Sequence, residues 1–290
     1  PPESASLTLL KIAQLAAQAG MPAGVLNVVT GLGQISGQAM GMHMDIDVLA
    51  FTGSGGVGRR LLEYSAKSNL KRVYLELGGK SPNIIFADCD FDKMLSTTIR
   101  SSFANQGQIC LCGSRIFVER PIYEKFKTAF VEKVGRMKVG NPADDTTKMG
   151  AIVSQSHMEK VLSYVDLAKD EGGTILTGGN QALVAGECAE GWFIHPTIIE
   201  GLSFDCRTNQ EEIFGPVVTI MPFDTEEEVL IMANSTKYGL ASTVWTENLK
   251  KAHRMARNLH AGIVWINCWL LRDLRTPFGG AKQSGVGREG

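Results

Sequence analysis

The feature that most constrains the fold is an alternation of short apolar runs with helical segments over the first part of the chain. Each apolar run ends in a turn that contains Gly, and apolar residues recur at helical spacing between the runs. Continuous apolar strands joined by helices indicate parallel strands buried on both faces, because the helices cover the sheet. The chain is therefore predicted to be an α/β protein with a doubly wound sheet. The predicted strands are 25–29, 48–51 and 72–77, and the predicted helices are 4–19, 35–42 and 57–67.

The same alternation continues after Gly79 with longer helices. Residues 178–191 are rich in Gly and Ala and are predicted to form an exposed loop. The segment 275–290 contains many Gly and basic residues, and no strand is predicted in it. The predicted helices are 91–105, 121–138, 155–171, 225–235 and 248–259, and the predicted strands are 83–86, 114–118, 217–222, 241–246 and 263–266.

Charge and composition exclude several classes of function. The 290 residues include 29 Lys and Arg against 30 Asp and Glu, so nothing electrostatic favours a nucleic acid or an anionic membrane as partner. No apolar run reaches the roughly 20 residues that span a bilayer. The six Cys lack a disulfide-framework spacing and are interpreted as reduced thiols of a cytoplasmic protein. His and Cys do not cluster, so no metal site is expected.

The segment Gly53-x-Gly55-x-x-Gly58 follows a predicted strand and opens a predicted helix. This is the context of a dinucleotide-binding turn, in which glycines let the backbone approach a pyrophosphate at the helix N-terminus. A tight strand–helix turn without a ligand explains the pattern equally well. If the turn binds a dinucleotide, Glu76 lies where an acid that binds the ribose is expected.

Two further residues are candidates for chemistry. Cys110 lies between a predicted helix and a predicted strand, where a thiol could be exposed and have a lowered pKa. A buried apolar role is the commoner fate of a Cys, and it applies to Cys110 and to Cys112. Glu76 stands between Leu75 and Leu77, so it is either a carboxylate at a strand end or a base whose pKa burial raises.

Several motifs in a fixed order make the chain resemble the aldehyde dehydrogenase superfamily over essentially all of its length. The spacing between Glu76 and Cys110 also matches that family. The motifs are Phe51-Thr52-Gly53-Ser54, Leu75-Glu76-Leu77-Gly78-Gly79-Lys80-Ser81-Pro82-Asn83, Asn105-Gln106-Gly107-Gln108-Ile109-Cys110, Glu211-Glu212-Ile213-Phe214-Gly215-Pro216, Tyr238-Gly239-Leu240-Ala241 and Pro277-Phe278-Gly279-Gly280-Ala281-Lys282-Gln283-Ser284-Gly285.

The resemblance implies NAD-dependent oxidation of an aldehyde to a carboxylic acid. Cys110 matches the nucleophile that forms a thiohemiacetal and then a thioester, and its backbone N–H would be one oxyanion donor. Glu76 matches the general base that activates the hydrolytic water, which replaces its interpretation as a ribose-binding acid. The resemblance assigns cofactor binding to Glu3, Gly33, Gly53, Ser54, Glu212 and Phe214.

Within the superfamily, Ile109-Cys110-Leu111-Cys112 and the segment 267–275 most resemble the 2-aminomuconate and 2-hydroxymuconate semialdehyde dehydrogenases. Arg272, and secondarily Arg275, are the residues expected to bind the substrate carboxylate. The alternative for Arg272 is an ion pair with Asp273 or another acid that only stiffens the loop. A general or betaine-aldehyde-type dehydrogenase and a catalytically silent structural relative are the alternative functions.

The resemblance also implies a domain organisation. Residues 1–78 would be the C-terminal part of an NAD-binding domain, 79–282 a catalytic domain and 283–290 the start of a further segment. The family's second oxyanion donor, an Asn, and a cofactor-binding Lys would lie before Pro1, so the chain is expected to be truncated at both ends. The intact protein is expected to be a homodimer or homotetramer.

Overall fold

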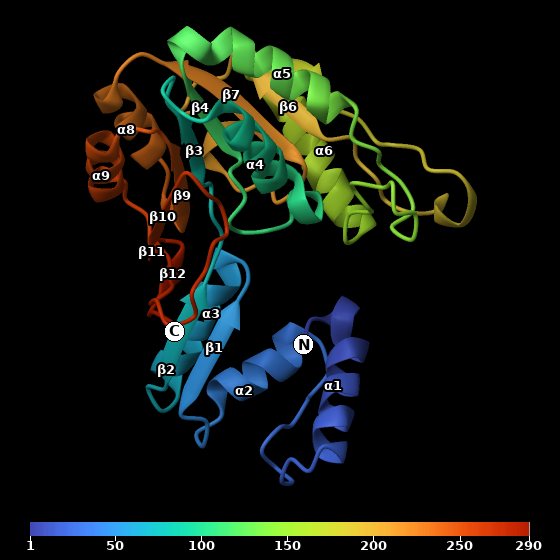
Figure 1. Ribbon diagram of the computed structural model, residues 1–290. Helices are drawn as coiled ribbons and strands as arrows, with labels where there is room; N and C mark the ends of the chain where they lie inside the picture. Colours follow the sequence, from blue (N-terminus) through green and yellow to red (C-terminus); the bar gives the residue numbers. More distant parts are fainter. Residues whose placement is uncertain (290) are drawn as a thin grey trace. The chain divides into compact units, whose positions relative to one another are not determined.

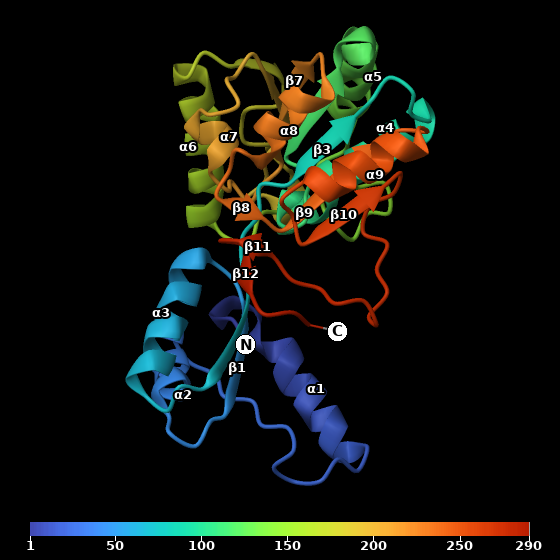
Figure 2. The same ribbon diagram turned by 90° about the vertical axis from the view of Figure 1, so that its left-hand side faces the viewer.

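A computed structural model of the chain describes residues 1–289 (Figures 1 and 2). The chain divides into two compact units, Pro1–Leu75 and Glu76–Gly290. The division after Leu75 falls close to the domain boundary that the resemblance implies after residue 78, which stays a prediction.

The first unit contains three helices and the strand β1, with most of β2. Ser54 caps α3, since its hydroxyl accepts a hydrogen bond from the Val57 N–H at 3.4 Å. The side chains of this unit are mostly exposed, and none of the thirteen residues of α1, all of them described, is buried. The elements are the 3₁₀ turn Glu3–Ala5, α1 (Ser6–Gln18), the π turn Gly33–Gly37, α2 (Gln38–Met42), β1 (Val48–Thr52), α3 (Gly55–Lys67) and β2 (Arg72–Glu76).

Two expectations for this unit are wrong. Residues 25–29 do not form a strand, and Val25 and Val29 are 67% and 56% exposed. A strand needs a neighbour to accept and donate its backbone hydrogen bonds, and no described residue pairs with this run. β1 is not buried on both faces either, because its residues alternate between exposed and half-buried. Apolar composition alone therefore overestimated the burial of this part of the sheet.

The second unit is built on a seven-stranded sheet with the order β10-β9-β3-β4-β7-β6-β5. All neighbours are parallel except β5 and β6, which are antiparallel. The strands are β3 (Pro82–Ile85), β4 (Arg115–Glu119), β5 (Thr174–Thr177), β6 (Thr197–Glu200), β7 (Val217–Phe223), β9 (Ala241–Trp245) and β10 (Ile263–Ile266). The main helices are α4 (Phe91–Phe103), α5 (Tyr123–Gly135), α6 (Gln155–Asp170), α8 (Glu226–Asn234) and α9 (Leu249–Asn258).

Successive residues of the central strands enter different cores, because strand side chains alternate between the two faces of a sheet. Ile85 and Ile116 pack in a cluster with residues of α4 and α5. Ile84 and Phe117 pack in a second cluster with residues of α8 and α9. The helices on opposite faces can be followed in Figure 1. This two-sided burial is what the continuous apolar runs predict, and here the prediction is confirmed.

Some elements of this unit were not predicted. The strands β5 and β6 and the short helix α7 (Arg207–Gln210) were missed, since no strong periodicity marks such short segments. The segment 275–290, in which no strand was predicted, contains β11 (Ala281–Lys282) and β12 (Gly285–Val286). β11 pairs with β8 (Tyr238–Gly239), a contact that only the tertiary fold creates. Among the described residues, no helix combines the length and the apolar character needed to cross a membrane.

Candidate active site

Cys110 lies in a tight turn between α4 and β4. The turn begins with Asn105 and Gln106, both in the left-handed backbone region with φ of 49° and 58°. It closes with a hydrogen bond of 3.0 Å from the Cys112 N–H to the Ile109 carbonyl oxygen. Two consecutive non-glycine residues in this region are unusual and mark backbone strain at a site that the surrounding structure must hold. The turn thus presents Cys110 in one fixed orientation.

The Cys110 thiol is half-buried, and burial raises its pKa to about 11. The negative charges of Glu212 and Glu76 raise the pKa further, because they disfavour a nearby thiolate. Of the two interpretations left open for Cys110, the structure therefore favours the buried thiol over the exposed thiol with a lowered pKa. Burial is the main cause of the raised pKa, and it arises only in the folded chain. A nucleophilic Cys110 requires a base that removes its proton.

Glu76 is the last residue of β2 and is only 7% exposed. Burial raises the pKa of its carboxyl, Glu289 raises it further, and the positive charges of Arg288 and Arg272 act in the opposite direction. Its Oε2 atom is buried and has no hydrogen-bond partner among the described residues. A buried carboxylate oxygen without a partner is costly unless a ligand or a water meets it. Burial, a raised pKa and an unpartnered oxygen are properties that a general base requires.

Two glycines bring Glu76, Cys110 and Glu212 into one neighbourhood. A Cβ atom on Gly79 would lie 2.6 Å from the Cys110 carbonyl oxygen, and a Cβ on Gly78 would overlap a carboxylate oxygen of Glu212. The Gly79 N–H also donates to Glu212 Oε1 at 2.9 Å. Only glycine permits such close approaches. The Gly-Gly pair after Glu76 is thus the point where three distant segments meet.

A small cavity next to this point is lined by Cys110, Glu212 and Phe214. Burial raises the pKa of Glu212, while its hydrogen bond from Gly79 and the charges of Lys160 and Lys80 lower it. Phe214 has a φ of 61° and is 36% exposed. The His157 ring nitrogen Nε2 lies 2.7 Å from the Phe214 carbonyl oxygen. The structure therefore places two of the predicted cofactor residues beside the predicted nucleophile.

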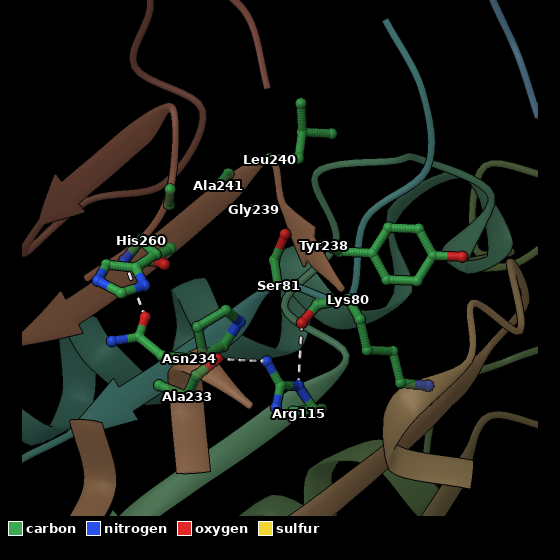
Figure 3. Close-up of a pocket in the computed structure, with 13 residues that line it drawn as sticks. Lys80, Ser81, Arg115, Ala233, Asn234, Tyr238, Gly239, Leu240, Ala241 and His260 are labelled. Atoms are coloured by element: carbon green, nitrogen blue, oxygen red, sulfur yellow. Dashed lines mark hydrogen bonds between the residues drawn. The ribbon is translucent and has the colours of Figure 1, made fainter. Parts of the chain in front are cut away.

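One buried cation, Arg115, supports the segment that follows the Gly-Gly pair (Figure 3). Arg115 donates from Nε to the Lys80 carbonyl oxygen at 2.9 Å and from its other nitrogens to the carbonyl oxygens of Met232 and Ala233. The Lys80 side chain extends away from Arg115, and burial together with the charge of Arg115 lowers the pKa of Lys80 to about 7. Arg115 thus fixes the backbone next to Gly79 and binds the C-terminal end of α8.

The remaining cofactor candidates lie in the first unit. The Gly33 N–H donates to Glu3 Oε1 at 2.9 Å, and this hydrogen bond is the main cause of the lowered pKa of Glu3. Both residues line a mainly apolar cavity of about 460 Å³, together with Phe51 and Tyr64. Ser54 caps α3, so its hydroxyl lies at a helix N-terminus, where a phosphate is favoured. The cavity is mainly apolar and is lined by one carboxylate, Glu3, and one guanidinium, Arg60.

The loop 267–276 carries the two candidate arginines. Arg275 forms an ion pair with Asp273, and its Nε donates to Asp273 Oδ1 at 2.9 Å. Arg272 instead lies 4.0 Å from the ring centroid of Phe278. The described structure contains no ion pair between Arg272 and Asp273. The stiffening role considered for Arg272 thus belongs to Arg275, which leaves the Arg272 guanidinium available for an anion.

Sequence reasoning gave no role to several residues that organise the site. The Ser284 hydroxyl donates to the Gly78 carbonyl oxygen at 2.7 Å and accepts from the Gly239 N–H at 2.9 Å. Lys80 and Ser284 stand inside recognised motifs, so their place in those motifs was the available signal. His157 carried no such signal, since its contact with Phe214 depends on the packing of α6.

The chain matches the aldehyde dehydrogenase family over residues 1–290 and belongs to that family. It is 49% identical to the 2-aminomuconic semialdehyde dehydrogenase of Danio rerio and 47% identical to the 2-hydroxymuconic semialdehyde dehydrogenase of Pseudomonas putida. Each match covers 100% of this chain and 60% of the relative, so the chain spans about three-fifths of their length. A solved indole-3-acetaldehyde dehydrogenase in complex with NAD⁺ superposes with a TM-score of 0.96 at 47% identity, covering 100% of this chain and 58% of that one. The resemblance found in the motifs is confirmed.

Proposed function

We propose that the full-length protein oxidises a carboxylated aldehyde, a 2-aminomuconate or 2-hydroxymuconate semialdehyde, to the corresponding acid with NAD⁺. The observation that carries this proposal is the convergence of Cys110, Glu76 and Glu212 around the Gly-Gly pair, with Glu76 Oε2 buried and unpartnered among the described residues. Membership of the family and the names of the relatives support the reaction class and the substrate.

The proposed chemistry begins at the Cys110 sulfur. Its proton passes to solvent, and the sulfur forms a bond to the aldehyde carbon to give a thiohemiacetal. The Cys110 N–H would donate to the developing oxyanion. NAD⁺ supplies a hydride acceptor when bound, so the thiohemiacetal becomes a thioester. Glu76 then takes a proton from water, the hydroxide adds to the thioester carbon, and the acid leaves as the C–S bond breaks.

The cofactor would be held at two places. Glu3 and Gly33 would bind the adenosine end in the cavity of the first unit, with Gly53 and Ser54 at the pyrophosphate. Glu212 and Phe214 would bind the nicotinamide end beside Cys110. The lowered pKa of Glu3 keeps it ionised, which favours ribose hydroxyls and disfavours a 2′-phosphate. We therefore propose NAD⁺ in preference to NADP⁺.

Arg272 is proposed to bind the substrate carboxylate. Its charge acts on the pKa of Glu76, so the guanidinium lies within electrostatic range of the catalytic base. A guanidinium binds a carboxylate through two parallel hydrogen bonds. Arg275 is the weaker candidate, because its guanidinium already forms an ion pair with Asp273.

The test compares two arginine variants on two substrates. Arg272→Ala should raise KM for a muconate semialdehyde by an amount equivalent to about 2–5 kcal/mol if the pair is desolvated, and should change KM little for a neutral aldehyde of similar length. Arg275→Ala is the matched control and should have a small effect on both. Equal losses for both substrates in Arg272→Ala would refute the carboxylate assignment. Absence of NADH formation from any aldehyde would refute the reaction itself.

We further propose that the full-length protein is a cytoplasmic homodimer or homotetramer. All six Cys are free, which suits a reducing compartment. Large apolar side chains such as Leu7 and Leu271 are 80% and 75% exposed in this chain, and burial against another surface would remove them from water. Light scattering of the eluted protein during size-exclusion chromatography measures the assembly, and a monomeric mass would refute it.

A further inference from the structure

The loop 267–276 between β10 and β11, drawn in red in Figures 1 and 2, is fixed at defined points. Asn267 and Leu270 have φ of 52° and 59°, so the backbone turns sharply at two non-glycine residues. The Trp265 indole N–H donates to the Leu271 carbonyl oxygen at 2.9 Å. A loop held in strained conformations by side-chain hydrogen bonds is a positioned structure.

Trp269 connects this loop to the turn of the nucleophile. It is 4% exposed, and its indole N–H donates to the carbonyl oxygen of Leu111, the residue after Cys110, at 3.1 Å. Its ring belongs to the apolar cluster that also contains Leu111 and Phe278, against which Cys110 packs. A buried Trp satisfies its N–H wherever it can, and here the acceptor belongs to the catalytic turn.

The other side of Trp269 is held by Arg100 of α4. Arg100 donates to the Trp269 carbonyl oxygen at 3.3 Å, and its guanidinium lies 5.6 Å from the ring centroid. Arg272, three residues after Trp269, lies over the ring of Phe278, which is in the same cluster. The cation proposed to bind substrate and the proposed nucleophile are therefore attached to one group of packed aromatic rings.

We propose that Trp269 is a positioning residue that fixes the separation between the Cys110 sulfur and the Arg272 guanidinium. Through this separation it selects aldehydes by the distance between their carboxylate and their aldehyde carbon. The inference rests on the proposed function, because it takes Arg272 as the group that binds the carboxylate. Trp269 touches neither the aldehyde carbon nor the carboxylate in this scheme, and acts only through the loop and the turn.

The experiment is a double-mutant cycle in the full-length protein, with kcat and KM measured for a muconate semialdehyde and for a neutral aldehyde of similar length. Trp269→Phe keeps an aromatic ring and removes the N–H, which leaves the buried Leu111 carbonyl oxygen without its donor. We expect kcat/KM for the carboxylated aldehyde to fall on the order of tenfold and the value for the neutral aldehyde to fall much less. In an Arg272→Ala background, Trp269→Phe should no longer change the ratio of kcat/KM for the carboxylated aldehyde to kcat/KM for the neutral aldehyde.

Trp192→Phe is the matched control, since Trp192 is 37% exposed and lies outside the cluster. Arg100→Gln is the second variant should Trp269→Phe not fold, because Arg100 is exposed and its loss leaves the core intact. It should shift the substrate ratio in the same direction by a smaller factor.

Three outcomes overturn the inference. Equal losses of kcat/KM for both substrates in Trp269→Phe would mean that Trp269 only contributes to packing. An undiminished effect of Trp269→Phe in the Arg272→Ala background would mean that it acts independently of Arg272. If Arg272→Ala alone leaves the substrate ratio unchanged, the carboxylate assignment under the proposed function fails, and this result is recognisable before Trp269 is altered.

Discussion

The two units of the chain hold their candidate sites in different ways. In the second unit, Cys110 and Glu76 lie beside the close contacts of Gly78 and Gly79, and the sheet of this unit has residues such as Ile84 and Ile116 that are 0% exposed. In the first unit, Glu3 is an exposed carboxylate at the edge of an open cavity, held by one backbone hydrogen bond. Bond-forming chemistry requires fixed geometry and a controlled pKa, whereas recognition of an adenosine group needs mainly an apolar surface and one charge.

The largest expected effect separates chemistry from cofactor recognition. Cys110→Ala should reduce aldehyde oxidation by about 10⁴-fold or more, because no other group can form the covalent intermediate. Binding of NAD⁺, measured by calorimetry, should change little, since the adenosine end would bind in the other unit. Cys112→Ala, two residues along the same chain segment, is the control and should retain most of the activity. A Cys110→Ala variant that still forms acid would place the nucleophile elsewhere.

Replacement of the base should slow one step and spare another. Glu76→Gln keeps the size of the side chain and should reduce the steady-state rate by about 10²–10⁴-fold, because the thioester is no longer hydrolysed. A rapid burst of NADH should remain if another group can accept the thiol proton. Loss of the burst would instead show that Glu76 also accepts that proton. Glu190→Gln, in the exposed loop, should behave as wild type.

The pH dependence follows from the direction of the Glu76 shift. Burial raises its pKa above that of a free Glu, so a larger fraction is protonated at mildly acidic pH. Hydrolysis needs the ionised form, and its rate should therefore fall as pH decreases through this raised pKa. Glu76→Gln should remove that acidic limb. An acidic limb that persists in Glu76→Gln would assign it to another group, such as Glu212.

The contrast in packing gives a prediction on stability for the 290-residue chain. Phe126 is 0% exposed and stacks on Phe130 with centroids 5.0 Å apart, so Phe126→Ala should lower the free energy of unfolding of the second unit by about 3–5 kcal/mol. Leu7 of α1 is 80% exposed, and Leu7→Ala should change the free energy of unfolding of the first unit by less than about 0.5 kcal/mol. Urea unfolding followed by circular dichroism measures both. A large loss in Leu7→Ala would mean that α1 is covered in solution.

The difference between the two units also explains which features of the fold and of the site could be predicted from the sequence. Cys110 and Glu76 were identified because contiguous motifs surround them, and the central strands because continuous apolar runs specify burial on both faces. The strand at 25–29 was predicted wrongly because a strand depends on a partner that composition does not reveal. The sequence left the exposed and the buried interpretations of Cys110 open, because the burial that raises the pKa of its thiol arises only in the folded chain. The different partners of Arg272 and Arg275 also needed the tertiary structure.

The smallest expected effect concerns the exposed carboxylate of the first unit. Glu3→Gln keeps an oxygen that can accept from the Gly33 N–H but removes the negative charge. The ratio of kcat/KM for NAD⁺ to that for NADP⁺ should fall by about tenfold or less, because solvent and salt screen an exposed charge. The effect of Glu3→Gln on this ratio should become smaller still at high ionic strength, because salt screens the charge of Glu3. An effect caused by altered packing of the side chain would not depend on salt. Glu63→Gln is the matched control, since Glu63 is an exposed acid of α3 that does not line the cavity. An unchanged ratio in Glu3→Gln at low salt would mean that the apolar cavity alone recognises the adenosine, and that the charge of Glu3 does not select the cofactor.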